Sequence, residues 1–344
     1  QNTTNNEWGT TAIGANNTAT ANSALAVGNN NQATKGASTA IGVSSIASGE
    51  ASIAIGNVAQ ATQIRATAVG NRATATQDSA SAYGNRANAN AQFATAVGTE
   101  ANATQESASA YGDRANATGA RATAVGSEAS ALDYDATAVG AGAKALTGAA
   151  TAVGKNANAS HQDSIAIGRN AAANWTNAIA VGKDSVAKQD HAIAAGTSAN
   201  ASGIQAIGVG SYTKAEGNLT VAVGPYAQAN KEAAVAVGSN ATAAESNSIA
   251  VGQTATAANN NSIAVGTKTV SRGDNAIGIG AYTESTALRS TAVGVLSQAN
   301  GAGSFAGGAS AHATGENSVA IGGALNGTLG NKAGTAAKAV GNNS

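Results

Sequence analysis

Apolar and polar positions repeat every fourteen residues along most of the chain. Glycine stands at position 14 and at every fourteenth position after it as far as Gly322, which gives 23 glycines in register without an insertion or a deletion. An unbroken short period is typical of a solenoid, in which each period is one turn stacked on the turn before it. The sequence therefore predicts a solenoid with fourteen residues per turn. Positions within a turn are counted from its glycine, position 0.

Two stretches of each turn alternate in the way that β-strands do. Position −2 is alanine except where Gly208 and Gly278 replace it, and position −1 is mostly Val or Ile. Positions +3 and +5 are mainly alanine, whereas +2, +4 and +6 are mainly polar. Alternation with a period of two indicates strands, and Gly, Asn and Asp between them indicate tight turns. We therefore expect an all-β protein, a parallel β-roll with two short strands per turn.

Position −2 tolerates only alanine and glycine, so we expect it to lie inside the narrow roll together with positions +3 and +5. The other face of the first strand then exposes Val, Ile and occasionally Tyr. A continuous apolar stripe in water marks an interface, and identical copies around one axis could bury it. The opposite parity, with Val and Ile inside and alanine at the interface, stays open and also predicts an oligomer. The residues predicted at the interface are Val69, Tyr83, Val97, Tyr111, Val125, Ile167, Val181, Val237, Val251, Val265 and Ile279.

The period also predicts the boundaries of the repeat domain. Residues 1–9 are polar and only loosely in register, which indicates an N-terminal lead-in, and residues 10–322 carry the 23 turns. Ala336 stands where the next glycine belongs, and residues 323–344 are rich in Gly, Asn and Ala. Because the ends of a solenoid expose strand edges, we expect residues 323–344 to form an irregular cap or the start of a connector.

Charge and composition argue against several classes of function. Eighteen basic residues balance 18 acidic ones, which argues against nucleic acid as a partner. The chain has no cysteine, so it holds neither disulfides nor thiolate metal sites. It has no apolar run of about 18 residues, so any signal for secretion or membrane attachment would lie outside this sequence.

Side chains that could carry catalysis are scattered. His161, His191 and His312 occupy three different positions of the turn, and the acidic residues at position +8 lie two or more turns apart. Asp78 and Glu106 could meet the separation of a carboxylate pair, but the pattern predicts no pocket that would shift their pKa values. We therefore expect no enzyme, no metal ion and no cofactor.

A second rhythm, with a period of two turns, runs between Gly70 and Gly126. Residues 75–84 and 103–112 match almost position for position, and Arg-Ala-Asn-Ala begins two residues after each segment. Duplication of a two-turn unit is the simpler explanation, and a specialised ligand-binding patch is the alternative. The candidate ligand-binding residues are Asp78, Arg86, Glu106, Arg114 and, as an aromatic anchor, Trp175.

The repeated columns resemble the YadA-like head repeats of trimeric autotransporter adhesins. The consensus of that family, Asn-Ser-Val-Ala-Ile-Gly, occurs unchanged at residues 317–322, and close variants occur at 163–168, 177–182, 247–252 and 261–266. The resemblance covers residues 10–322. It implies a left-handed parallel β-roll that assembles as a homotrimer and is displayed at the cell surface, on the outer membrane of a Gram-negative bacterium. The resemblance also implies that membrane attachment occurs only through a stalk and an anchor that are absent from this sequence.

In some members of the family this consensus, extended by a serine three residues after the glycine, is associated with collagen binding. Residues 177–182 followed by Ser185 come closest here, although Ala178 replaces the serine of the motif. Because the same residues build the strand, we interpret the motif mainly as scaffold.

The resemblance implies the head domain of a bacterial surface adhesin. Such a domain would attach to host cells, to an extracellular matrix protein such as collagen or fibronectin, or to an abiotic surface, through weak contacts repeated many times. It would contribute to virulence. Two alternatives stay open, a passive spacer that holds another domain away from the cell and an ice-binding solenoid. The threonine columns that ice binding would need, such as Thr18 with Thr20 and Thr74 with Thr76, are interrupted by Asn, Lys, Gln and Leu.

Overall fold

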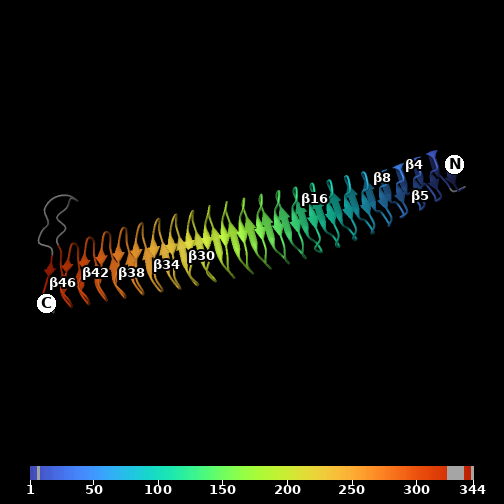
Figure 1. Cartoon of the computed structure of the whole chain (residues 1–344). Coiled ribbons are helices and arrows are strands. Elements are labelled where there is room, and N and C mark those ends of the chain that lie inside the picture. The colour runs from blue at the N-terminus through green and yellow to red at the C-terminus, as the bar shows by residue number, and fades with distance from the viewer. Residues whose placement is uncertain (6–7, 324–336, 342–344) are drawn as a thin grey trace, which may run out of the picture. The chain divides into compact units, whose positions relative to one another are not determined.

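Each period of the sequence forms one turn of a roll, with one strand on either side (Figure 1). The front sheet contains the even-numbered strands, which begin at position −3 and end at −1 or, in the first four, at +1. The back sheet contains the odd-numbered strands, which lie at positions +4 and +5 except at the two ends of the chain. The computed structural model describes residues 1–5, 8–323 and 337–341. These residues belong to two compact units, 1–171 and 172–344.

Both sheets run through the first unit. Its front sheet comprises β2 (Thr11–Ala15), β4 (Leu25–Asn29), β6 (Thr39–Val43), β8 (Ile53–Asn57), β10 (Thr67–Val69), β12 (Ser81–Tyr83), β14 (Thr95–Val97), β16 (Ser109–Tyr111), β18 (Thr123–Val125), β20 (Thr137–Val139), β22 (Thr151–Val153) and β24 (Ile165–Ile167). Its back sheet comprises β1 (Thr3–Thr4), β3 (Thr18–Ala19), β5 (Gln32–Ala33), β7 (Ile46–Ala47), β9 (Gln60–Ala61), β11 (Thr74–Ala75), β13 (Asn88–Ala89), β15 (Asn102–Ala103), β17 (Asn116–Ala117), β19 (Ser130–Ala131), β21 (Lys144–Ala145) and β23 (Asn158–Ala159).

The second unit repeats this arrangement. Its front sheet comprises β26 (Ile179–Val181), β28 (Ile193–Ala195), β30 (Ile207–Val209), β32 (Val221–Val223), β34 (Val235–Val237), β36 (Ile249–Val251), β38 (Ile263–Val265), β40 (Ile277–Ile279), β42 (Thr291–Val293), β44 (Phe305–Gly307) and β46 (Val319–Ile321). Its back sheet comprises β25 (Ala172–Ala173), β27 (Val186–Ala187), β29 (Asn200–Ala201), β31 (Lys214–Ala215), β33 (Gln228–Ala229), β35 (Thr242–Ala243), β37 (Thr256–Ala257), β39 (Val270–Ser271), β41 (Glu284–Ser285), β43 (Gln298–Ala299), β45 (His312–Ala313) and β47 (Lys338–Ala339).

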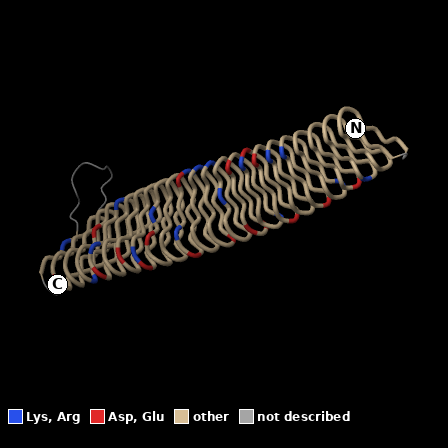
Figure 2. Tube along the Cα trace, turned by 45° about the vertical axis from the view of Figure 1, so that its right-hand side comes forward, with Lys and Arg blue, Asp and Glu red and all other residues tan. Residues whose placement is uncertain are grey.

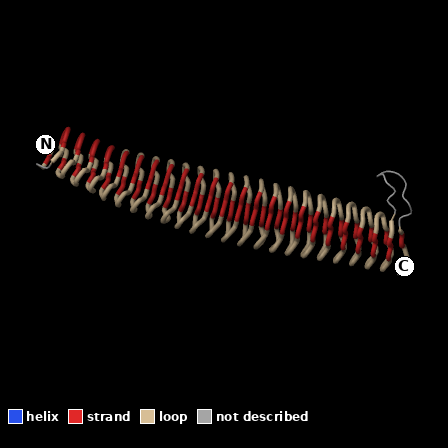
Figure 3. Tube along the Cα trace, turned by 180° about the vertical axis from the view of Figure 1, so that it is seen from behind, coloured by secondary structure: helices blue, strands red, loops and turns tan. Residues whose placement is uncertain are grey.

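Neighbouring strands within each sheet are parallel and one period apart. Residues 67–69 of β10 stand opposite residues 81–83 of β12, and the back-sheet strands β11 and β13 pair in the same register. Figure 3 shows the strands of each unit stacked in this way, with loops joining the two sheets. An inserted residue would break the ladder between turns, which is the reason for the unbroken period. The predicted all-β parallel roll with fourteen residues per turn is confirmed.

Alanine fills the inside of the roll. Nearly all alanines at positions −2, +3 and +5 are buried, and Ala68, Ala73 and Ala75 have no exposed surface. Val69, at the neighbouring position −1, is partly exposed. The predicted parity of the front strand is therefore confirmed, and the opposite parity is wrong. Position −4 is also buried in most turns, as at Ala66, and it was not singled out from the sequence.

The glycine of each turn lies where no side chain fits. Gly70 has a φ of +141°, and a Cβ atom on it would lie 2.2 Å from the carbonyl oxygen of Gly84 in the next turn. Gly266 has a φ of +132°, and its Cβ atom would lie 2.1 Å from the oxygen of Gly280. Only glycine combines this backbone conformation with so close an approach. The stacking of turns therefore requires the glycine column.

The backbone is also left-handed at positions +2 and +9, where most residues are not glycine. Asn247, Asn261 and Asn317, all at position +9, have φ angles of 56°, 55° and 55°. The N–H of Asn261 donates to the carbonyl of Ser246 in the previous turn at 3.0 Å. Asparagine is one of the few L-residues that adopt this conformation at low cost. Backbone geometry therefore explains the asparagine that begins the family consensus.

The serine of the consensus lies at position −4 and closes the preceding loop. Ser262 and Ser318 are buried, and their Oγ atoms donate at 2.7 Å to the carbonyl oxygens of Asn259 and Gly315. Together with the inward alanine and the turn glycine, the Asn and Ser residues serve the fold. The two outward apolar residues of the consensus are left without a role inside the roll.

Residues outside the regular period also join the back sheet. Strand β1 pairs with β3 in a register that joins Thr3 to Thr18, and β47 pairs with β45 in a register that joins His312 to Lys338. Ala336 lies outside the described residues. The predicted boundaries of the lead-in at 1–9, the repeats at 10–322 and the tail at 323–344 stay predictions.

Replacing Gly278 with alanine should destabilise the protein because the interior there is already full. A Cβ atom on Gly278 would lie 2.8 Å from Oγ of Ser271 and 2.9 Å from Cγ2 of Thr269. Overpacking of this kind costs about 1–3 kcal/mol. In a background with Thr269→Ala and Ser271→Ala, the same substitution should cost less than about 0.5 kcal/mol. Thermal unfolding measures both, and equal costs in the two backgrounds would contradict the packing account.

Replacing Leu219 with asparagine should stabilise the protein by about 1 kcal/mol, because Leu219 occupies the left-handed region that asparagine tolerates. Its φ is 59°, and its side chain is 52% exposed. The control is Leu219→Ala, which removes the same exposed apolar atoms and keeps the strained backbone. Chemical unfolding should show a gain for asparagine alone. A gain of the same size for alanine would attribute the effect to the exposed leucine and not to the backbone.

Candidate functional site

The outward side chains of the front sheet form an apolar stripe in each unit. Five of the residues predicted at an interface are 38–43% exposed, namely Tyr83, Tyr111, Ile167, Val181 and Ile279. The others lie in the same position of the turn and are partly exposed, namely Val69, Val97, Val125, Val237, Val251 and Val265. The roll therefore leaves uncovered an apolar column of the kind that marks an interface.

The stripe differs between the two units at position −3. From Thr67 to Thr151 in the first unit this position is Thr or Ser, whereas from Ile179 to Ile277 in the second unit it is Ile or Val. Residues two apart in a strand point to the same face, so position −3 lies beside position −1. These turns of the second unit therefore present two apolar columns, and these turns of the first unit present one apolar column beside one of hydroxyl groups.

A polar groove of about 530 Å³ lies across four turns of the first unit. One wall comes from position +2, where the backbone is left-handed with φ angles between 53° and 58°. The residues that line the groove are Arg86, Glu100, Arg114 and Glu128 at position +2, Asn88, Asn102, Asn116 and Ser130 at position +4, and Ala115. Figure 2 shows basic and acidic residues interspersed along the turns of this unit. The groove combines both signs of charge with amide and hydroxyl groups.

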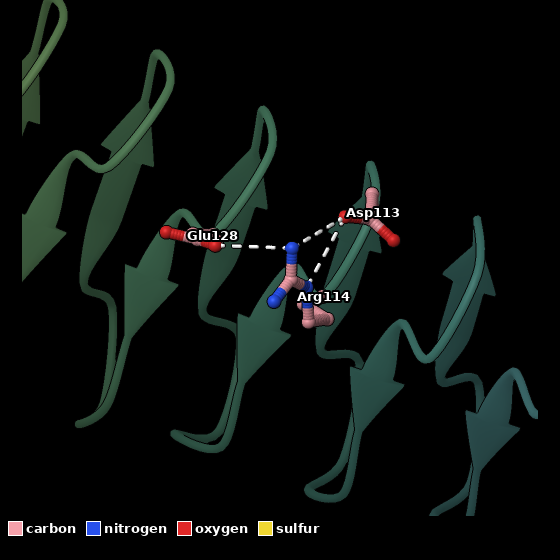
Figure 4. A network of polar contacts seen from close by, with 3 residues as sticks. All are labelled: Asp113, Arg114 and Glu128. Carbon is pink, nitrogen blue, oxygen red and sulfur yellow. Dashed lines mark hydrogen bonds and ion pairs between the residues drawn. The ribbon is translucent and has the colours of Figure 1, made fainter.

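Ion pairs connect the charged residues of the groove from turn to turn. Nη1 of Arg86 lies 3.1 Å from Oε1 of Glu100, and Nη2 of Arg114 lies 3.1 Å from Oε1 of Glu128 and from Oδ2 of Asp113 (Figure 4). The hydrogen bond to Asp113 and the negative charges of Asp113 and Glu128 raise the pKa of Arg114. These side chains are exposed, so the pairs contribute little to stability. Their main effect is to set charges of alternating sign one turn apart.

A row of side-chain amides lines the groove beside the charged residues. Nδ2 of Asn88 donates to Oδ1 of Asn102 at 2.8 Å, and Nδ2 of Asn102 donates to Oδ1 of Asn116 at 3.0 Å. Each of the three amides is therefore oriented by a neighbour one turn away. The groove presents polar groups that are already ordered before a ligand or partner arrives.

The structure brings together only part of the patch predicted from the two-turn rhythm. Arg86 and Arg114 line one groove, but Asp78 and Glu106 are at position +8, in the loop on the opposite edge of the roll. Trp175 is 43% exposed and belongs to the second unit. The acidic neighbours of the arginines in the groove are Glu100 and Glu128. Reading position +2 as a column would have found them.

Aromatic side chains also occupy position +2 of the second unit, which the sequence reasoning missed. The rings of Tyr212 and Tyr226 stack with their centroids 5.1 Å apart and an angle of 7° between their planes. The ammonium group of Lys268 lies 5.2 Å from the ring centroid of Tyr282. All three tyrosines are about half exposed and have left-handed φ angles. Ring stacking and a cation–π contact along the column therefore order these side chains at the surface.

The described residues offer no metal site formed by three or more His, Asp or Glu side chains. In the same part of the chain, no helix has the length and apolar character needed to cross a membrane.

Comparison with known protein families gives matches along nearly the whole chain. The matching family is described as YadA head domain repeat (2 copies). The matched residues are 9–31, 33–59, 61–87, 89–115, 117–143, 149–171, 176–199, 201–227, 215–241, 243–269, 271–297, 285–311 and 299–324. The comparison with curated proteins gives no match. The chain therefore belongs to the YadA head domain repeat family and is an adhesin-type domain of trimeric autotransporters, a structural class of domain and not a class of enzyme.

Proposed function

We propose that three copies of the chain assemble through their front sheets and that the trimer attaches a bacterium to other surfaces through its outward polar columns. It would be displayed on the outer membrane of a Gram-negative bacterium. The observation that carries the proposal is the apolar stripe at position −1, which a second apolar column at position −3 accompanies in most turns of the second unit. The family of trimeric autotransporter head repeats supports the same assembly.

The physical reason for assembly is that the interior of a single roll buries little apolar surface. Each turn buries mainly alanine side chains, which remove little apolar area from water. The larger apolar side chains, Val and Ile, point outward instead and gain from burial only against another molecule. Identical copies related by one rotation axis present the same stripe to that axis and bury it together. The residues proposed at the trimer interface are the eleven of the predicted stripe.

Adhesion would then depend on many copies of the same weak contact, one set per turn and per chain. The polar positions +2, +4 and +6 recur once per turn, and a trimer would display three copies of each column. Individually weak contacts to a matrix protein such as collagen or fibronectin, to a host cell or to an abiotic surface become strong when many form at once. Trp175 and the arginines of the groove are the proposed contact residues.

Replacing Val251 with aspartate should separate the copies, because the new carboxylate would lie in the stripe where burial removes it from water. A buried unpaired charge costs several kcal/mol, so the variant should sediment as smaller species than the unchanged chain at the same concentration. The matched control is Thr256→Asp in β37, whose side chain points outward from the back sheet. Equal sedimentation of the two variants would contradict a front-sheet interface.

Substitution of the groove arginines should weaken attachment of whole cells more than substitution of the loop carboxylates. Arg86→Ser with Arg114→Ser removes both guanidinium groups from one ordered groove, whereas Asp78→Ser with Glu106→Ser changes two residues on the other edge. Removing several exposed polar contacts that are used together should reduce attachment at least about tenfold. Attachment is measured as cells retained on a collagen-coated, a fibronectin-coated or a plastic surface under flow. An unchanged retention of the arginine variant on all three would remove the groove from the proposal.

A further inference from the structure

The four charges of the groove alternate in sign along the stack of turns. Arg86, Glu100, Arg114 and Glu128 occupy the same position of successive turns. Two ion pairs between neighbouring turns, Arg86 with Glu100 and Arg114 with Glu128, each at 3.1 Å, orient these side chains. Reversing the direction of such a column turns every positive position into a negative one. A column with this property is complementary to itself when two copies run in opposite directions.

One antiparallel arrangement pairs every charge of the column with an opposite charge. A two-fold axis perpendicular to the stack, midway between Glu100 and Arg114, places two copies face to face and antiparallel. Arg86 of one copy then faces Glu128 of the other, and Glu100 faces Arg114. All four charges meet a charge of opposite sign. A two-fold contact of this kind is isologous, because both copies use the same surface.

A parallel contact would have the opposite result. In that arrangement each charge of the column would face its own equivalent, so that Arg86 would meet Arg86 and Glu100 would meet Glu100. Like charges placed across an interface are unfavourable. A parallel contact shifted by one turn pairs three of the charges, whereas the antiparallel contact in this register pairs all four, so the column favours the antiparallel arrangement.

We propose that the groove lined by residues 86–130 is a contact surface between two copies of this chain, which pair antiparallel through their charge columns. Such pairing would join molecules that project toward each other from opposing surfaces, so it goes beyond attachment to a foreign surface. It does not depend on the front-sheet interface, because all the residues belong to one face of a single chain.

The amide and hydroxyl groups that line the groove fit the same arrangement. The axis that pairs the charges places Asn102 opposite Asn116 and Asn88 opposite Ser130. An amide carries both a donor and an acceptor, so amides facing amides can hydrogen-bond across the contact. The existing bonds from Asn88 to Asn102 and from Asn102 to Asn116 orient these groups in advance.

The neighbouring residues limit the contact to four turns. The same axis places Arg72 opposite Gly142, whose turn also carries Lys144, so the next turns bring together two positive charges and no new opposite pair. Asp113 adds a negative charge to the groove, but it is hydrogen-bonded to Arg114 of its own copy at 3.1 and 3.2 Å. Exposed ion pairs contribute about 0–1 kcal/mol each, so one contact is weak and becomes effective when many form together.

The test uses the full 344-residue chain in sedimentation velocity at about 0.01 M and about 0.5 M salt, because exposed charges are screened at the higher salt. Arg86→Glu with Arg114→Glu makes the column entirely acidic, and Glu100→Arg with Glu128→Arg makes it entirely basic. Each variant alone should self-associate at least about tenfold more weakly than the unchanged chain at low salt. An equimolar mixture of the two variants should associate again, since acidic columns then meet basic ones.

A matched control changes the net charge by the same amount away from the groove. Lys188→Glu with Lys214→Glu does this in the second unit and should leave association at low salt unchanged. The proposal is overturned if the unchanged chain does not associate further at low salt, if the acidic variant associates as the unchanged chain does, or if the mixture stays dissociated. A trimer held by the apolar stripe would persist at about 0.5 M salt, where charge contacts are screened, so its absence there would count against the trimer alone.

Discussion

The close approach of one turn to the next at the glycine column is the constraint on which the rest of the structure depends. At Gly70 a side chain would lie 2.2 Å from the oxygen of Gly84, and the backbone there has a φ that disfavours L-residues. Turns stacked this closely enclose a thin interior, which alanine fills without exposed surface. Even there, Gly278 replaces alanine where Thr269 and Ser271 take up the space.

Because the interior is thin, the larger apolar side chains point outward. The fold therefore creates the apolar stripe through which copies of the chain could assemble. Val and Ile at position −1 have no place inside the roll, so they form a stripe on the front sheet. The second unit adds Ile or Val at position −3, where most of the first unit has Thr or Ser. In the first unit, charged and amide side chains also form a groove. The units therefore differ in the surface that they present at positions −3, +2 and +4.

The repeat, the two strands and the inward alanines were predictable because each depends on spacing along the chain. An unbroken period sets every turn in register with the next, and a position restricted to Ala and Gly points to the tightest space. The left-handed residues at positions +2 and +9 were harder to predict, because Arg, Tyr, Leu and Phe occupy them as well as Asn. Their conformation is imposed by hydrogen bonds to the previous turn and not by their own preference.

The candidate site was only partly predictable for a related reason. The two-turn rhythm drew attention to Asp78 and Glu106 as partners of the arginines, because those acids lie within the duplicated segment. In the structure, position +8 lies on the opposite edge of the roll from position +2, and the acids beside Arg86 and Arg114 are Glu100 and Glu128. Neighbours in the stack are residues one period apart, so columns, and not segments of sequence, define the surfaces of this protein.

The central claim is that the apolar stripe is buried between three copies, and the molar mass in solution tests it most directly. Light scattering of the intact chain at about 0.5 M salt leaves apolar contacts in place while exposed charges are screened. The account predicts about 98 kDa, three times the 32.7 kDa of one chain. A folded species that stays at 32.7 kDa over a wide range of concentrations would contradict it.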